Sequence, residues 1–124
     1  MMMDYSELPS LASYYLEDSY VLNIDFPTGE LVFRLDLVLT EDHPDYHQPG
    51  PDEQYCYVDG SLIFKDVAHL EWVSKNFQAN TDAAGEEDMG NIDFLKYSED
   101  HWRVGGDWGE VLVYTSARPE VALA

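Results

Sequence analysis

The apolar positions near the start of the chain recur at helical spacing. They fall at i, i+3, i+4, i+7 and i+8, which places them on one face of a helix: Leu8, Leu11, Ala12, Tyr15 and Leu16. Pro9 suits a first helical turn, where its missing N–H has no intrahelical partner. The pattern therefore predicts one short N-terminal helix.

From Tyr20 onward the period changes to two. Apolar residues alternate with mixed ones over 20–26 and again over 31–39, and the turn sequence Pro27-Thr28-Gly29 lies between these runs. Alternation on both sides of a turn is typical of a β-hairpin. We expect this hairpin to present one apolar face, with Tyr20, Leu22, Ile24 and Phe26 on it, and one mixed face.

The rest of the chain also has strand character. Residues 55–58 and 61–65 flank Asp59-Gly60, which favours a type I′ turn, and strand character resumes over 67–73. Three further strands are expected over 92–97, 101–104 and 110–115, with a short edge strand over 121–123. The sequence thus predicts a mainly β single domain over 1–124, of about seven strands with the N-terminal helix, as a twisted antiparallel sheet folded into a sandwich or open barrel.

Two acidic loops interrupt this pattern. Residues 41–53 contain Pro44, Pro49, Gly50 and Pro51, which disfavour both a central strand and a helix interior. Residues 76–91 form the second loop. Long loops in compact domains are often functional, so we expect binding residues in both.

The charge balance is strongly acidic. The 124 residues include 6 lysines and arginines against 25 aspartates and glutamates, giving a net charge of −19. Such a field repels phosphate backbones and anionic lipids, and it attracts basic proteins and cations. We therefore expect neither a nucleic-acid nor a membrane partner, although acidity also serves solubility alone.

Cys56 is the only cysteine, so the chain cannot form an intramolecular disulfide. Its start carries neither the basic region nor the apolar run of a secretory signal, and no apolar run reaches the ~18 residues of a membrane span. These features favour a cytoplasmic location.

The segment from His43 to His47 is the candidate metal site. Two imidazoles with Asp42 or Asp45 nearby could bind zinc or nickel. The i, i+4 spacing brings ligands together on a helix, however, and Pro44 favours a loop. A pair of surface histidines in an acidic loop is the alternative explanation.

Residues 82–93 have the length of a calcium-binding loop but not its ligand pattern. Ala84 occupies a ligand position, and Glu87 stands where the sharp turn needs glycine. We therefore interpret this stretch as a solvated acidic loop, with weak calcium binding through Glu86, Glu87 and Asp88 as the alternative.

Aromatic residues provide the other binding candidates. Trp108 lies in a run with three glycines, at positions 105, 106 and 109, which favours either a binding anchor or a turn whose Trp covers the core. Tyr55 and Tyr57 share one strand face opposite Cys56 and Val58, so one pair must point away from the core.

No catalytic or phosphate-binding motif occurs in the sequence, and no cofactor is expected. The leading hypothesis is a non-enzymatic binding protein that neutralises a basic partner, by analogy of size and charge with immunity proteins and inhibitors. The predicted partner-binding residues are Asp42, Asp45, Asp52, Glu53, Tyr55, Tyr57, Glu86, Glu87, Asp88 and Trp108. Alternatives are a metal-dependent enzyme using His43 and His47, a nucleic-acid mimic, and a homodimer paired through tyrosines and the C-terminal strand.

Overall fold

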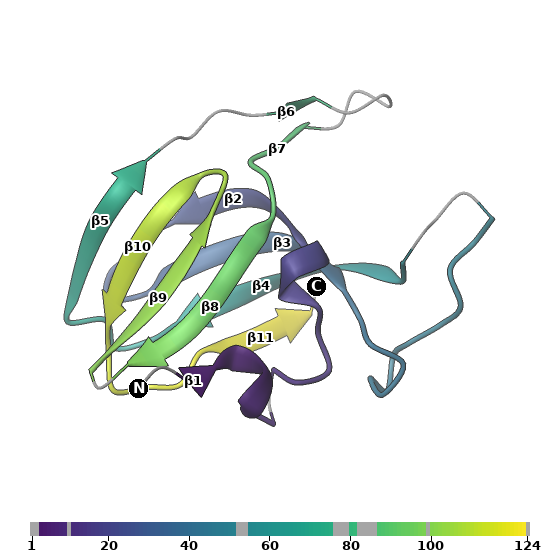
Figure 1. The fold of residues 1–124 in the computed structure, drawn as a ribbon, viewed down its shortest axis with the longest axis horizontal. Coiled ribbons are helices and arrows are strands. Elements are labelled where there is room, and N and C mark those ends of the chain that lie inside the picture. The colour runs from purple at the N-terminus through teal and green to yellow at the C-terminus, as the bar shows by residue number, and fades with distance from the viewer. Residues whose placement is uncertain are drawn as a thin grey trace.

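The computed structural model describes residues 3–9, 11–51, 55–75, 80–81, 87–98 and 100–123. It is mainly β, as predicted, and its two larger antiparallel sheets face each other as a sandwich (Figure 1). The five-stranded sheet has the order β1 (Met3–Asp4), β8 (Ile92–Ser98), β9 (His101–Gly106), β10 (Gly109–Tyr114) and β5 (His69–Lys75). The four-stranded sheet has the order β11 (Glu120–Leu123), β4 (Tyr57–Phe64), β3 (Leu31–Val38) and β2 (Tyr20–Asp25). A further pair consists of β6 (Asn80–Thr81) and β7 (Glu87–Asp88).

The core lies between the two larger sheets. Strand β3 alternates as predicted, so that Leu31, Phe33, Leu35 and Leu37 are fully buried. Aromatic rings join the sheets across the core: the ring centroids of Phe33 and Trp108 are 5.2 Å apart. Buried aromatic pairs of this kind contribute about 0.5–1.5 kcal/mol beyond the area they bury. Within the described residues, no helix has the length and apolar character needed to cross a membrane.

The predicted N-terminal helix is replaced by turns. Within the described residues of this segment, the helical structure consists of two three-residue 3-10 helices, η1 (Tyr5–Glu7) and η2 (Leu16–Asp18). Between them the backbone bonds to the sheet instead of to itself: Tyr15 N–H donates to Val38 O (2.9 Å), and Thr40 N–H donates to Ser13 O (3.0 Å). A helix of so few turns is marginal in water, so these sheet contacts prevail.

The predicted turn at Asp59-Gly60 is also wrong, because both residues lie inside the continuous strand β4. A Cβ at residue 60 would lie 2.5 Å from Leu37 Cδ1 and 2.9 Å from Ala122 O. The glycine therefore allows β11 and the core to approach β4 closely, a role that glycine has inside strands.

The hairpin of β2 and β3 is confirmed, and the predicted apolar face of β2 is confirmed at Ile24, which packs against the core. The register shifts between Val21 and Asn23, leaving Leu22 as an extra residue in a β-bulge. Before the bulge, Val21 is therefore buried in place of Tyr20 and Leu22, and Phe26, which follows β2, is 53% exposed. A second bulge occurs in β5, where Val73 has no opposite residue in β10.

The last third of the chain forms the strands expected from its alternation, β8, β9, β10 and the edge strand β11. Trp108 stands in the turn between β9 and β10 and is fully buried, with its Nε1–H donating to Asn91 O at 3.1 Å. It therefore covers the core, which is one of the two roles that its sequence setting favours, and partner binding by Trp108 stays a prediction.

Candidate functional site

A pocket of about 370 Å³ lies where the loop between β3 and β4 leaves the sandwich. Beyond the pocket the loop projects away from both sheets (Figure 1). Three tyrosines and two acidic residues account for the chemistry of its lining: Tyr15, Tyr46, Tyr55, Glu41 and Asp42. We call this the tyrosine pocket. It joins the segment before β2 to both ends of the long loop.

Backbone hydrogen bonds hold the base of the tyrosine pocket. Tyr15 and Thr40 bond to Val38 and Ser13, as described above, and Leu39 N–H donates to Cys56 O at 3.0 Å. Three chain segments that are far apart in sequence are thus fixed next to one another. A site held in this way loses little conformational entropy when it binds a ligand.

The two loop histidines lie beside the pocket and hold the loop. The Nδ1 atom of His43 accepts from Asp45 N–H (3.0 Å), and its Nε2 lies 3.0 Å from the Tyr14 hydroxyl. The Nδ1 atom of His47 lies 3.1 Å from the Sγ of the buried Cys56. Each imidazole thereby connects the loop to the base of the pocket.

The two imidazoles therefore contact different parts of the protein: His43 contacts Tyr14 and Asp45, and His47 contacts Cys56. Within the part of the chain that the structure describes, no group of three or more His, Cys, Asp and Glu could hold a metal ion. Metal binding by His43 and His47 stays a prediction, which elemental analysis can test.

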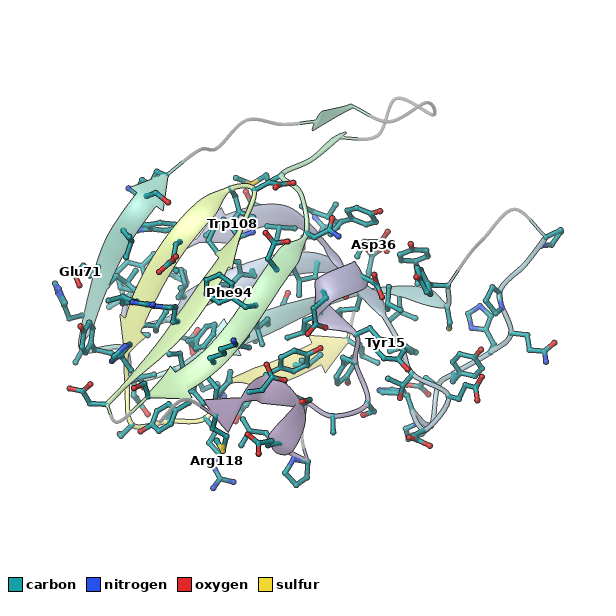
Figure 2. The ribbon with its side chains drawn as sticks, in the orientation of Figure 1. Tyr15, Asp36, Glu71, Phe94, Trp108 and Arg118 are labelled. Atoms are coloured by element: carbon teal, nitrogen blue, oxygen red, sulfur yellow. The ribbon has the colours of Figure 1, made fainter. Side chains whose placement is uncertain are left out.

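A second cluster lies next to the pocket on the outer face of the four-stranded sheet. Tyr57 stacks on Tyr20, with ring centroids 6.4 Å apart, and meets the Tyr55 ring edge-on at 6.1 Å. Asp36 pairs across the strands with both Tyr20 and Asp59. We call Tyr20, Tyr57, Asp36 and Asp59 the acidic face. Figure 2 shows Asp36 and Tyr15 on the side of the molecule from which the loop projects.

Two carboxylates of the acidic face stand opposite each other in the sheet. Asp36 and Asp59 are register partners on neighbouring strands. Burial, followed by the neighbouring Tyr20 and Asp36, raises the pKa of Tyr57 to about 12. Asp36, Tyr57 and Asp59 also line a hollow of about 370 Å³. A positive group in this hollow would lie beside both carboxylates.

The structure brings some of the predicted partner-binding residues together. Asp42 and Tyr55 line the pocket, Tyr57 belongs to the acidic face, and Asp45 is exposed on the loop. Glu87 and Asp88 form β7. Three of the predicted residues, Asp52, Glu53 and Glu86, lie outside the described residues.

Sequence reasoning missed Tyr15, Tyr46, Tyr20, Asp36 and Asp59 as site residues. Tyr15 was assigned to a helical core stripe, and Asp59 to a turn that does not form. The signal that could have found Asp36 was its place among the polar positions of an alternating strand, on the same face as Tyr20.

Comparisons with protein-family models, with curated proteins and with solved structures found no match for this chain. The pocket and the acidic face are therefore the basis for a functional proposal.

Proposed function

We propose that this protein is a non-enzymatic, acidic binding module that captures a basic protein, in the manner of an immunity protein or inhibitor. The observation that carries the proposal is the direct opposition of Asp36 and Asp59 beside two tyrosine rings. Two carboxylates opposite each other on one face of a sheet concentrate negative charge there, and a basic partner can place a cation beside both.

The charge of the whole chain supports the same proposal. A net charge of −19 accelerates the encounter with a basic protein, and the tyrosines of the site supply contact area at low entropic cost. Arg34 lies two positions before Asp36 on β3 and lines a hollow together with Asp59, so it supplies one positive charge near the acidic face.

The test is binding of a synthetic nona-arginine peptide, measured by isothermal titration calorimetry at low and high salt. Replacing both carboxylates in Asp36→Asn/Asp59→Asn should weaken binding at least about tenfold, which is about 1.4 kcal/mol. The matched control removes two charges from the other sheet, in Glu71→Gln/Asp93→Asn, where Glu71 lies on β5 (Figure 2).

The control variant should lose much less affinity than the double aspartate variant. Equal losses in the two variants would show that only the total charge matters, and the proposed site would then be wrong. Loss of binding at high salt is expected in either case, because the interaction is electrostatic.

A further inference from the structure

We infer that the tyrosine pocket binds a guanidinium group and that its occupant is an arginine side chain of the partner. This inference rests on the proposed function and names the ligand class of one part of the site. The pocket volume of about 370 Å³ falls within the range of small-ligand sites, roughly 300–1,000 Å³. One side chain with its flanking backbone would occupy such a space.

The lining of the pocket favours an organic cation. It combines three tyrosines with Glu41 and Asp42, and the described lining residues include no lysine, arginine or histidine. Tyrosine faces attract cations, and carboxylates accept hydrogen bonds from them. An anionic ligand would be repelled by the two carboxylates.

Among cations, guanidinium matches both parts of the lining. It is planar and weakly hydrated, stacks on aromatic faces, and presents a fork of N–H donors to carboxylates. A lysine ammonium is more strongly hydrated and loses more on entering an aromatic site. A quaternary ammonium has no N–H, so it could not donate to Glu41 or Asp42.

The Tyr15 side chain is available for such a ligand. It is 49% exposed although it is a large aromatic residue, and its backbone N–H is fixed to β3. The ring therefore stands at the pocket without being needed to fill the core. Burying it under a ligand would remove apolar surface from water.

The pocket is also continuous with the acidic face. Tyr55 lines the pocket and contacts Tyr57, which lines the hollow of Asp36 and Asp59. An extended basic segment with an arginine in the pocket could place a second cation over the two aspartates. This continuity favours the side chain of a protein over a free small molecule.

The experiment is an NMR titration of the full chain with three probes at equal ionic strength. These are N-acetylarginine methylamide, N-acetyllysine methylamide and tetramethylammonium chloride. The arginine probe should shift the backbone amides of Tyr15, Thr40 and Glu41 and bind at least about threefold more tightly than the lysine probe.

Tyr15→Ala should weaken binding of the arginine probe at least about fivefold. Glu41→Gln/Asp42→Asn should reduce the preference of the pocket for the arginine probe over tetramethylammonium. Phe26→Ala, which removes another exposed aromatic ring, is the matched control and should leave binding unchanged. Circular dichroism verifies that each variant is folded, and the double loop variant tests the inference independently of Tyr15.

Equal binding of arginine and lysine, or tightest binding of tetramethylammonium, would overturn the guanidinium assignment. If nona-arginine binds but the amides around the pocket do not move, this inference fails and the proposed function stands. If no basic probe binds, both fail. If an arginine-containing peptide binds more tightly than the single arginine probe, the result supports a protein side chain as the occupant of the pocket. Equal binding of the two overturns that assignment.

Discussion

Gly106 should be among the positions of this sandwich least tolerant of substitution. A Cβ added there would lie 2.0 Å from the backbone O of Asn91 and 2.7 Å from Trp108 Nε1. These two atoms form the hydrogen bond that satisfies the buried indole. Because one of the contacts is with backbone, Gly106→Ala must displace the segment around Asn91 or the Trp108 ring.

The cost has two parts. Forcing an extra carbon into a packed region costs roughly 1–3 kcal/mol, and leaving the indole N–H unpaired costs roughly 1–3 kcal/mol. The expected loss is therefore about 3 kcal/mol in the free energy of unfolding. Gly29→Ala is the matched control, because Gly29 has no atom within 4 Å of its added Cβ and only a φ of +74° to oppose the change. The left-handed conformation costs about 1–2 kcal/mol.

Urea denaturation followed by tryptophan fluorescence measures both variants. Gly106→Ala should lower the midpoint more than Gly29→Ala, with the slope against urea unchanged. Near-ultraviolet circular dichroism should also change for Gly106→Ala, since the surroundings of Trp108 must move. Equal midpoints for the two variants would refute the reasoning, because they would show that Asn91 moves aside at little cost.

Three further outcomes are expected. Folding raises the pKa of Tyr57 from 10.0 to about 12, so the unfolded chain releases this proton at a lower pH than the folded chain does. The free energy of unfolding should therefore hold below pH 10 and fall as the pH rises toward 12. Urea midpoints measured across this range should fall less in Tyr57→Phe. In His47→Ala, the Cys56 thiol should react with an aromatic disulfide reagent several-fold faster than in the wild type, whereas His69→Ala should leave this rate unchanged. Elemental analysis of untagged protein should find no stoichiometric zinc or nickel, and finding one would favour the metal-enzyme hypothesis.

Alternation predicted those parts of the fold in which one strand face is buried and the other is exposed. Strands β3, β8, β9 and β10 follow their sequence pattern because each packs one side on the core. The same rule predicted that Cys56 and Tyr57 lie on opposite faces, and Cys56 is buried whereas Tyr57 is not. It failed at Tyr20 and Leu22, because the extra residue in the bulge changes the faces on one side of it relative to the other, so that Val21 and Ile24 both meet the core.

The N-terminal segment and Gly60 were mispredicted for a different reason. Their local sequences favour a helix and a turn, but contacts with residues distant in sequence decide the outcome, such as Val38 for Tyr15 and Ala122 for Gly60. The tyrosine pocket shares this origin. Tyr15, Glu41 and Tyr55 come together only after the sheet has formed, so no local sequence pattern predicts the site.

The two bulges bear on how the protein associates. Strands β2 and β5 are edge strands of different sheets, and each has an extra residue that breaks regular pairing, Leu22 in one and Val73 in the other. A bulged edge is a poor template for a further strand. Sheet extension into fibrils or strand-swapped assemblies is therefore hindered at these two edges. The acidic face proposed to bind a partner is therefore open to other proteins, while the bulged β2 and β5 edges resist aggregation.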